Sequence, residues 1–99
     1  MDNILLVEDK VELREMLTHA LRRMGYDVAA TAGVNEALTA LEKQSFSAVL
    51  TDLKLPAGSG IDVLQSALDC DPAVPVIIMT AYGTIADAVS AMRDGAYDF

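Results

Sequence analysis

The segment Ala48-Val49-Leu50-Thr51-Asp52 constrains this chain most, because a run of strand-forming residues carries one carboxylate to the end of a strand. The first residues repeat the arrangement, since Ile4–Val7 is followed at once by Glu8 and Asp9. If the two strands are parallel neighbours, three carboxylates meet in one small crevice. Like charges that close are costly unless a cation lies among them or one carboxyl stays protonated. Carboxylate oxygens suit Mg²⁺, which often meets phosphoryl groups, so the pattern predicts acidic metal chemistry applied to phosphate.

Composition excludes several classes of protein. The 99 residues fit one domain, residues 1–99, and 53% are hydrophobic, which favours a packed core over disorder. No apolar run reaches the roughly 18 residues that span a bilayer, and no signal-peptide pattern opens the chain. A single cysteine, Cys70, agrees with a cytoplasmic location. The net charge of −8, without a basic cluster, argues against direct nucleic-acid binding and favours cations or a basic partner.

Short apolar runs alternate with amphipathic segments along the chain. Strands are predicted at Ile4–Val7, Tyr26–Ala30, Ala48–Thr51 and Val76–Thr80. Between and after them, apolar residues recur at helical spacing over 13–24, 34–41, 61–68 and 85–92. This alternation predicts an α/β fold with a doubly wound parallel sheet and helices on both faces. In such folds ligands bind beyond the carboxyl ends of the strands.

Helix ends carry their own signals. Asp9 with Glu12 has the spacing of an N-terminal capping pair, as does Thr84 with Asp87. Gly25 and Gly95 follow helical segments, where a left-handed residue commonly ends a helix.

Asp52 is the best candidate for a nucleophile toward phosphorus, because it stands alone at the end of the predicted central strand. Glu8 and Asp9 would then bind the metal, together with a backbone carbonyl just after Asp52. Thr80, at the end of the next strand, offers a hydroxyl to a phosphoryl oxygen. The placement of all four residues at strand ends carries more weight than any one of them.

Each residue also has a purely structural interpretation. Asp9 alone could be a helix cap, and Asp52 alone could begin a turn through Pro56. Gly58-Ser59-Gly60 lacks a third glycine and is interpreted as a loop leading into a helix at Ile61. His19 lies off the apolar stripe of its helix and is expected at the surface.

Four motifs together resemble a response-regulator receiver domain, of the flavodoxin-like type with strand order 2-1-3-4-5. The resemblance covers the whole chain, and the motifs read Ile4-Leu5-Leu6-Val7-Glu8-Asp9, Val49-Leu50-Thr51-Asp52-Leu53-Lys54-Leu55-Pro56, Gly58-Ser59-Gly60 and Pro75-Val76-Ile77-Ile78-Met79-Thr80-Ala81. Residues 80–99 are most similar to receivers of nitrogen-regulatory-type activators, which work with an alternative sigma factor.

The resemblance implies a role for each matching residue at the metal. Glu8 and Asp9 match the acidic pair that holds Mg²⁺. Asp52 matches the aspartate that takes a phosphoryl group from the phosphohistidine of a sensor histidine kinase. Lys54 matches the position whose backbone carbonyl meets the metal.

Two further residues match the family's switch. Thr80 corresponds to the hydroxyl that turns toward the phosphate, and Phe99 to the aromatic residue that rotates inward as the hydroxyl moves. In the family this pair couples the phosphate to a surface formed by the fourth helix, fifth strand and fifth helix.

The family pattern continues past Phe99 to a lysine, a proline and a full fifth helix, so the fifth strand is expected to be incomplete and the fifth helix missing. Without a preorganised cation at the phosphoryl group, transfer should weaken by a few kcal/mol as an order of magnitude. Bare apolar sheet surface should favour self-association of the chain.

Three functions are therefore weighed. The first is a phosphoacceptor switch modified on Asp52, and the second is a self-associating interaction module with impaired phosphorylation. The third is a phosphatase of the haloacid-dehalogenase type, which needs a second aspartate two residues after the nucleophile. Lys54 occupies that position, so the sequence predicts a protein that is not an enzyme, beyond Mg²⁺-dependent self-phosphorylation and self-dephosphorylation at Asp52.

Overall fold

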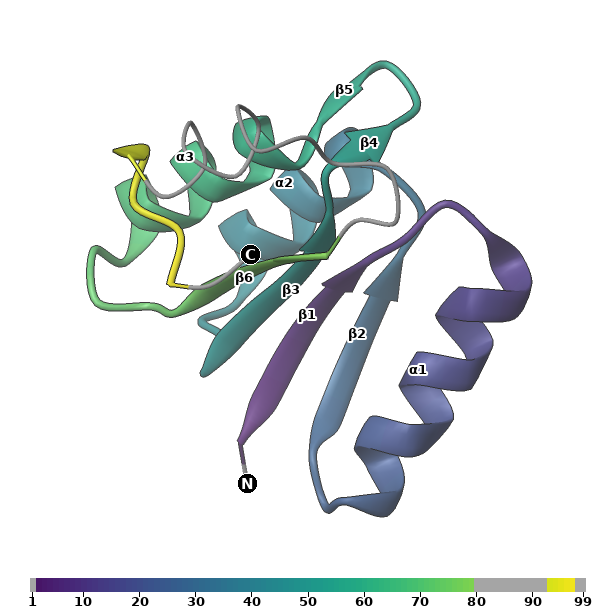
Figure 1. Ribbon diagram of the computed structural model, residues 1–99. Helices are drawn as coiled ribbons and strands as arrows, with labels where there is room; N and C mark the ends of the chain where they lie inside the picture. Colours follow the sequence, from purple (N-terminus) through teal and green to yellow (C-terminus); the bar gives the residue numbers. More distant parts are fainter. Residues whose placement is uncertain (1, 80–92, 98–99) are drawn as a thin grey trace.

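In the described part of the chain, four parallel strands form the central sheet (Figure 1). The computed structural model describes residues 2–79 and 93–97. In this part of the chain the strand order is β2-β1-β3-β6. The four strands are β1 (Asn3–Val7), β2 (Asp27–Thr31), β3 (Ala48–Asp52) and β6 (Val76–Met79). Because β6 is the fourth predicted strand, the order agrees with the predicted 2-1-3-4 arrangement.

Helices cover both faces of the sheet, as the doubly wound prediction requires (Figure 1). On one face lies α1 (Val11–Arg23), which packs on β1 and β2. On the other lie α2 (Val34–Lys43) and α3 (Gly60–Cys70), which pack against each other. The helix predicted over 85–92 lies outside the described residues.

Strand alternation divides the apolar residues between the two faces. Leu5, Val49 and Val76 lie side by side in register and belong to the main core beneath α2 and α3. The intervening residues, Leu6, Leu50 and Ile77, belong to the α1 face. Side chains alternate between the two faces along a strand. The residues that come next in β1 and β3 therefore also alternate between the α1 face and the face beneath α2 and α3.

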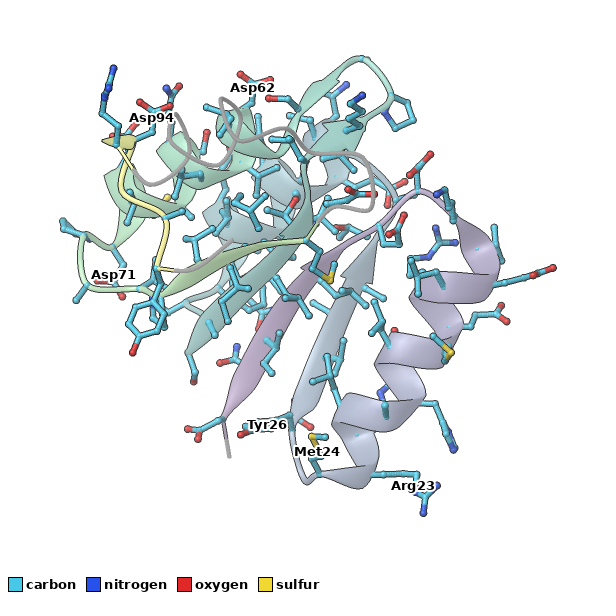
Figure 2. All side chains as sticks on the ribbon, viewed as in Figure 1. Arg23, Met24, Tyr26, Asp62, Asp71 and Asp94 are labelled. Atoms are coloured by element: carbon cyan, nitrogen blue, oxygen red, sulfur yellow. The ribbon has the colours of Figure 1, made fainter. Side chains whose placement is uncertain are left out.

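The α1 face of the sheet is only partly covered. None of the residues of α1 is fully buried, and Met16 keeps 61% of its surface exposed. Met24 and Tyr26, labelled in Figure 2, are also exposed beside the end of α1. A groove of about 440 Å³ runs from there across Ile4, Leu50 and Ile77. Within the described residues, no helix is both long and apolar enough to cross a membrane.

The left-handed conformation predicted for Gly25 and Gly95 is confirmed, and one predicted helix cap is wrong. Gly25 and Gly95 have φ of 98° and 106°. The pairing of Asp9 with Glu12 does not form, because Lys10 holds the N-cap position of α1 and no side chain caps it. Asp9 instead turns its carboxylate toward Glu8 and Asp52.

A short hairpin that the sequence analysis did not predict leads into α3. It is formed by β4 (Lys54–Leu55) and β5 (Gly58–Ser59), which pair antiparallel. Ser59 then caps α3 by accepting a hydrogen bond from the N–H of Ile61 at 3.1 Å, and Asp62 accepts one from the N–H of Ser59 at 3.0 Å. The helix therefore begins at Gly60, one residue before the predicted start.

Gly60 lies directly against the backbone of Asp52. A Cβ added at Gly60 would fall 2.3 Å from the carbonyl oxygen of Asp52. The N–H of Gly60 also donates to the carbonyl of Leu53 at 2.7 Å. The start of α3 thus fixes the chain just beyond the end of β3, and only glycine fits there.

The last described residues lie at the edge of the sheet. The N–H of Tyr97 donates to the carbonyl of Val76 at 2.7 Å. Residue 97 therefore lies beside β6, where a fifth strand was predicted.

Replacing Gly60 by alanine should destabilise the protein by about 1–3 kcal/mol, because the added methyl group must displace the backbone of Asp52. Urea unfolding would measure this loss. Gly33→Ala is the matched control, because Gly33 is extended and nothing lies within 4 Å of its added Cβ. Equal losses of stability in the two variants would show that the contact of Gly60 with the Asp52 backbone is not responsible.

Candidate metal and phosphoryl site

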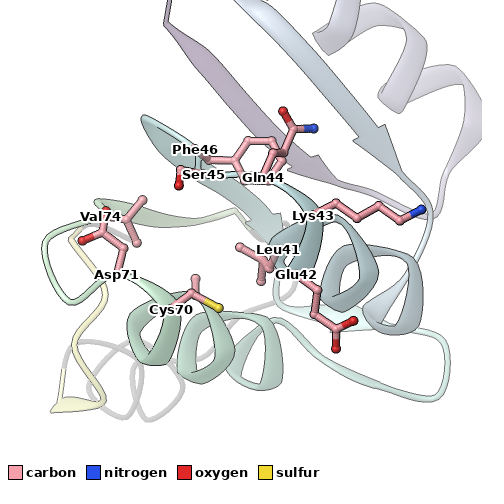
Figure 3. Close-up of a pocket in the computed structure, with 10 residues that line it drawn as sticks. Leu41, Glu42, Lys43, Gln44, Ser45, Phe46, Cys70, Asp71 and Val74 are labelled. Atoms are coloured by element: carbon pink, nitrogen blue, oxygen red, sulfur yellow. The ribbon is translucent and has the colours of Figure 1, made fainter.

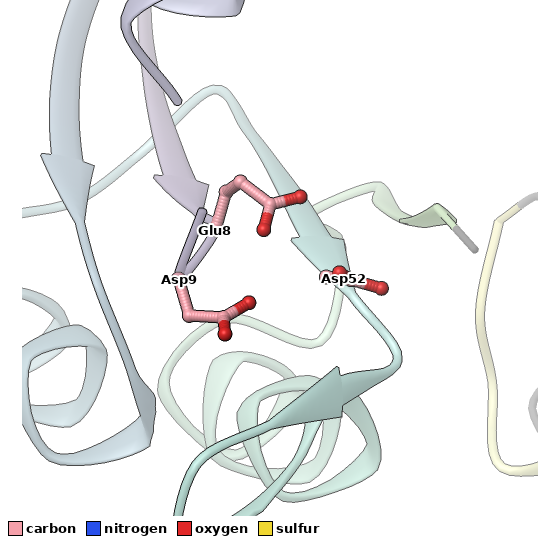
Figure 4. A group of neighbouring side chains, drawn as sticks. All are labelled: Glu8, Asp9 and Asp52. Atoms are coloured by element: carbon pink, nitrogen blue, oxygen red, sulfur yellow. The ribbon is translucent and has the colours of Figure 1, made fainter. Parts of the chain in front are cut away.

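Parallel pairing of β1 with β3 builds the acidic site. Val7 lies opposite Thr51 in the register, so Glu8 and Asp52 are the next residues of their strands and share a face. Figure 4 shows Glu8, Asp9 and Asp52 turned toward a common space at the ends of these strands. Each offers one carboxylate oxygen, and the three oxygens lie within 4.8 Å of one another. The structure therefore brings together the three carboxylates on which the sequence interpretation depends.

Glu8 is held more firmly than its two neighbours. Only 1% of its surface is exposed, whereas Asp9 and Asp52 are half-buried. Its N–H donates to the carbonyl of Thr31 at 3.0 Å, and its carboxylate accepts the N–H of Lys10 at 3.0 Å.

Burial raises the pKa of Glu8 above its usual value, and the neighbouring Asp52 and Asp9 carboxyls raise the pKa further. The hydrogen bond from the Lys10 N–H opposes this shift but does not cancel it. A raised pKa means that the folded protein without a cation holds the Glu8 proton more tightly than the unfolded chain does. The negative charge is therefore costly in the folded state, and a cation in the crevice would relieve that cost.

The backbone around Asp52 is fixed on both sides. The hydroxyl of Thr51, itself fully buried, donates to the carbonyl of Asp52 at 2.9 Å. The N–H of Leu53 donates to the carbonyl of Met79 at 3.0 Å. With Gly60 packed against it, the end of β3 has little freedom to move, while the Asp52 carboxylate stays accessible.

The donor set fits a small, hard divalent cation. All three ligand atoms are carboxylate oxygens, which Mg²⁺ and Ca²⁺ prefer over nitrogen and sulfur ligands. Oxygens bound about 2.1 Å from one Mg²⁺ ion lie at most about 4.2 Å apart. The observed spacing of up to 4.8 Å needs only a small closure, so Glu8, Asp9 and Asp52 could hold one such ion.

A second cavity lies at the opposite end of the sheet from the acidic site. It measures about 270 Å³ and lies where α2 and α3 end, beside Phe46 and Cys70 (Figure 3). Cys70 is exposed there as a free thiol. This cavity contains none of the predicted site residues.

Three predicted site residues are not tested by this geometry. Lys54 lies in β4 with an exposed side chain, and the role of its carbonyl stays a prediction. Thr80 and Phe99 lie outside the described residues.

Sequence reasoning missed two residues that shape the site. Gly60 was interpreted only as part of a loop, although its place between the hairpin and the helix is what holds Asp52. Arg14 was not singled out, but its guanidinium bonds the carbonyl of Glu8 at 3.0 Å. Neither role has a local sequence signal, because both are contacts between separate elements.

The sequence profile described as "Response regulator receiver domain" matches residues 4–99. This chain belongs to the response regulator receiver domain family. The predicted family and flavodoxin-like fold are thereby confirmed.

Curated relatives of this receiver domain include regulators of transcription. Response regulator protein PilR of Pseudomonas aeruginosa is 40% identical over 95 residues, covering 96% of this chain and 21% of the relative. Transcriptional regulatory protein ZraR of Escherichia coli K12 is 37% identical over 97 residues, covering 98% of this chain and 22% of the relative. The receiver domain thus spans about a fifth of the length of these relatives.

Solved receiver structures are similar throughout the fold. A response regulator from Burkholderia pseudomallei, described with a phosphorylated aspartic acid, a calcium ion and citrate, matches with a TM-score of 0.93 and 31% identity. The match covers 99% of this chain and 58% of that one. TrrA from Thermotoga maritima, in complex with Mg²⁺ and BeF, matches with a TM-score of 0.86 and 26% identity, covering 99% and 84% of the two chains.

Replacing Asp52 by asparagine should raise the free energy of unfolding in EDTA by about 1–2 kcal/mol at neutral pH. The substitution removes one of three mutually repelling charges, and a shift of one pKa unit corresponds to about 1.4 kcal/mol. The gain should shrink as the pH falls through the raised pKa of Glu8, because a protonated Glu8 no longer repels Asp52. Urea titrations at several pH values would measure this difference in the free energy of unfolding between the variant and the parent.

Asp27→Asn is the matched control for that substitution. Asp27 is an exposed carboxylate at the start of β2, at the end of the sheet remote from the acidic site. Equal stabilisation by the two variants would mean that the net charge of the chain, and not the acidic site, is responsible.

Proposed function

We propose that this receiver domain is a phosphoacceptor switch, in which Asp52 takes a phosphoryl group from a sensor histidine kinase with the help of Mg²⁺. The observation that carries the proposal is the convergence of Glu8, Asp9 and Asp52 within 4.8 Å at the ends of two paired strands. Membership of the receiver domain family supports the same function.

Different residues would bind the cation and react with the phosphoryl group. Glu8 and Asp9, with the carbonyl of Lys54, would hold the cation on one side of Asp52. When bound, Mg²⁺ draws negative charge from the phosphoryl oxygens and fixes their position. Glu8 suits this role because it is buried and hydrogen-bonded, so its carboxylate has one defined position.

Asp52 would form the new bond. One of its carboxylate oxygens attacks the phosphorus of a phosphohistidine, the phosphorus–nitrogen bond breaks, and the electron pair leaves with the imidazole. The Asp52 carboxylate is half-buried and so keeps part of its surface exposed to a donor. The product is an aspartyl phosphate, and Asp52 is modified without turnover of a separate substrate.

Thr80 and Phe99 complete the proposal as a switch. The Thr80 hydroxyl would bond a phosphoryl oxygen, and Phe99 would follow its movement and alter the surface around the fourth helix. Both roles come from the family resemblance. We expect this surface to control an output that regulates transcription, as the name of the relative ZraR suggests.

Self-association with impaired phosphorylation stays a prediction and is not the favoured function. The apolar groove beside α1 is compatible with a partner surface. The predictions of a cytoplasmic location and of no direct nucleic-acid contact also stay untested.

Incubation with acetyl phosphate and Mg²⁺ should add the mass of one phosphoryl group to the chain, as measured by intact-protein mass spectrometry. Asp52→Asn should remain unmodified, and EDTA should suppress labelling of the parent, because both nucleophile and cation are required. Asp27→Asn should be labelled like the parent. An adduct that persists in Asp52→Asn, or no adduct in the parent at any donor concentration, would contradict the proposed function.

A further inference from the structure

Arg14 binds the loop that presents the acidic pair. It lies in the first half of α1, and its half-buried guanidinium donates to the backbone carbonyl of Glu8 at 3.0 Å. Its own N–H donates to the carbonyl of Lys10 at 2.9 Å. Arg14 therefore makes hydrogen bonds to both the first and the last residue of the loop formed by residues 8–10.

Two side chains bond the backbone of this loop: the Glu8 carboxylate accepts the N–H of Lys10, and the Arg14 guanidinium donates to the carbonyl of Glu8. The N-cap residue, Lys10, makes no side-chain capping hydrogen bond, in contrast to Ser59 at the start of α3. A planar guanidinium with several fixed donors is well suited to hold a backbone carbonyl in one position. The bond from Arg14 ties the Glu8 carbonyl to α1 at the point where Glu8 and Asp9 leave β1.

The positive charge of Arg14 opposes cation binding, whereas its hydrogen bond to the Glu8 carbonyl should favour cation binding. A cation near the site raises the local potential, so charge alone would weaken the binding of Mg²⁺. Geometry and charge therefore predict opposite effects when Arg14 becomes neutral. Loss of geometry predicts weaker binding, and loss of charge predicts tighter binding.

We infer that Arg14 is a positioning residue for the divalent-cation site, fixing the Glu8 backbone so that the carboxylates of Glu8 and Asp9 converge with Asp52. The inference rests on the proposed function, because it assumes that these three carboxylates bind the cation. Partners of metal ligands commonly change metal affinity about tenfold or more when they are replaced.

The test compares Mg²⁺ affinity in R14Q, R14K and the control R22Q. Arg22 lies on the same helix and also donates to a backbone carbonyl, that of Val28 at 3.4 Å, but near the other end of α1. R22Q therefore removes the same charge and the same kind of bond away from the acidic site. Calorimetric titration with Mg²⁺ should show binding about tenfold weaker in R14Q, about threefold weaker in R14K, and unchanged in R22Q.

Thermal unfolding with and without Mg²⁺ separates positioning from a general loss of stability. A merely structural role would lower Tm equally in Mg²⁺ and in EDTA. Positioning predicts that R14Q also loses part of the Tm increase that Mg²⁺ gives to the parent. R14K retains the charge, so weaker binding in this variant reports geometry even if R14Q does not fold.

Any folded Arg14 variant that binds Mg²⁺ as tightly as R22Q, or more tightly, would overturn this inference and leave the proposed function intact. Failure of the parent chain itself to bind Mg²⁺ would instead overturn the proposed function, and the inference with it.

Discussion

Repulsion among three carboxylates is the constraint around which the rest of the site is organised. Parallel pairing of β1 with β3 forces Glu8 and Asp52 onto the same face at the ends of adjacent strands. The sheet pairing, the apolar core beneath it and the α3 start against Asp52 together supply the rigidity that keeps these like charges close. A fold that holds such charges together in the absence of a cation is poised to bind one, because binding removes a cost already present in the folded state.

Much of this arrangement follows from local pattern. Alternating apolar strands and amphipathic helices are enough to predict the parallel sheet, since each element can bury its apolar side in only a few ways. Once the sheet is parallel, residues that follow its strands must gather at one edge. This is why Glu8, Asp9 and Asp52 could be chosen before the fold was known, and why Gly25 could be assigned to a helix end.

Other features depend on contacts that no local pattern encodes. The β4–β5 hairpin consists of two-residue strands, which are too short to show a periodic signal. Asp9 has the sequence context of a helix cap, but its carboxylate is turned toward the other two acids. The roles of Gly60 and Arg14 arise only when distant segments meet, through a backbone packed against Asp52 and a guanidinium bonded to Glu8.

The central claim is that one divalent cation binds among Glu8, Asp9 and Asp52. Paramagnetic Mn²⁺, added in substoichiometric amounts to the ¹⁵N-labelled protein, tests it most directly by broadening amide signals close to the bound ion. The account predicts that broadening is centred on these three residues and is reversed by excess Mg²⁺. Broadening centred on the surface carboxylates of α3, such as Asp69, or spread evenly over the acidic surface, would contradict it.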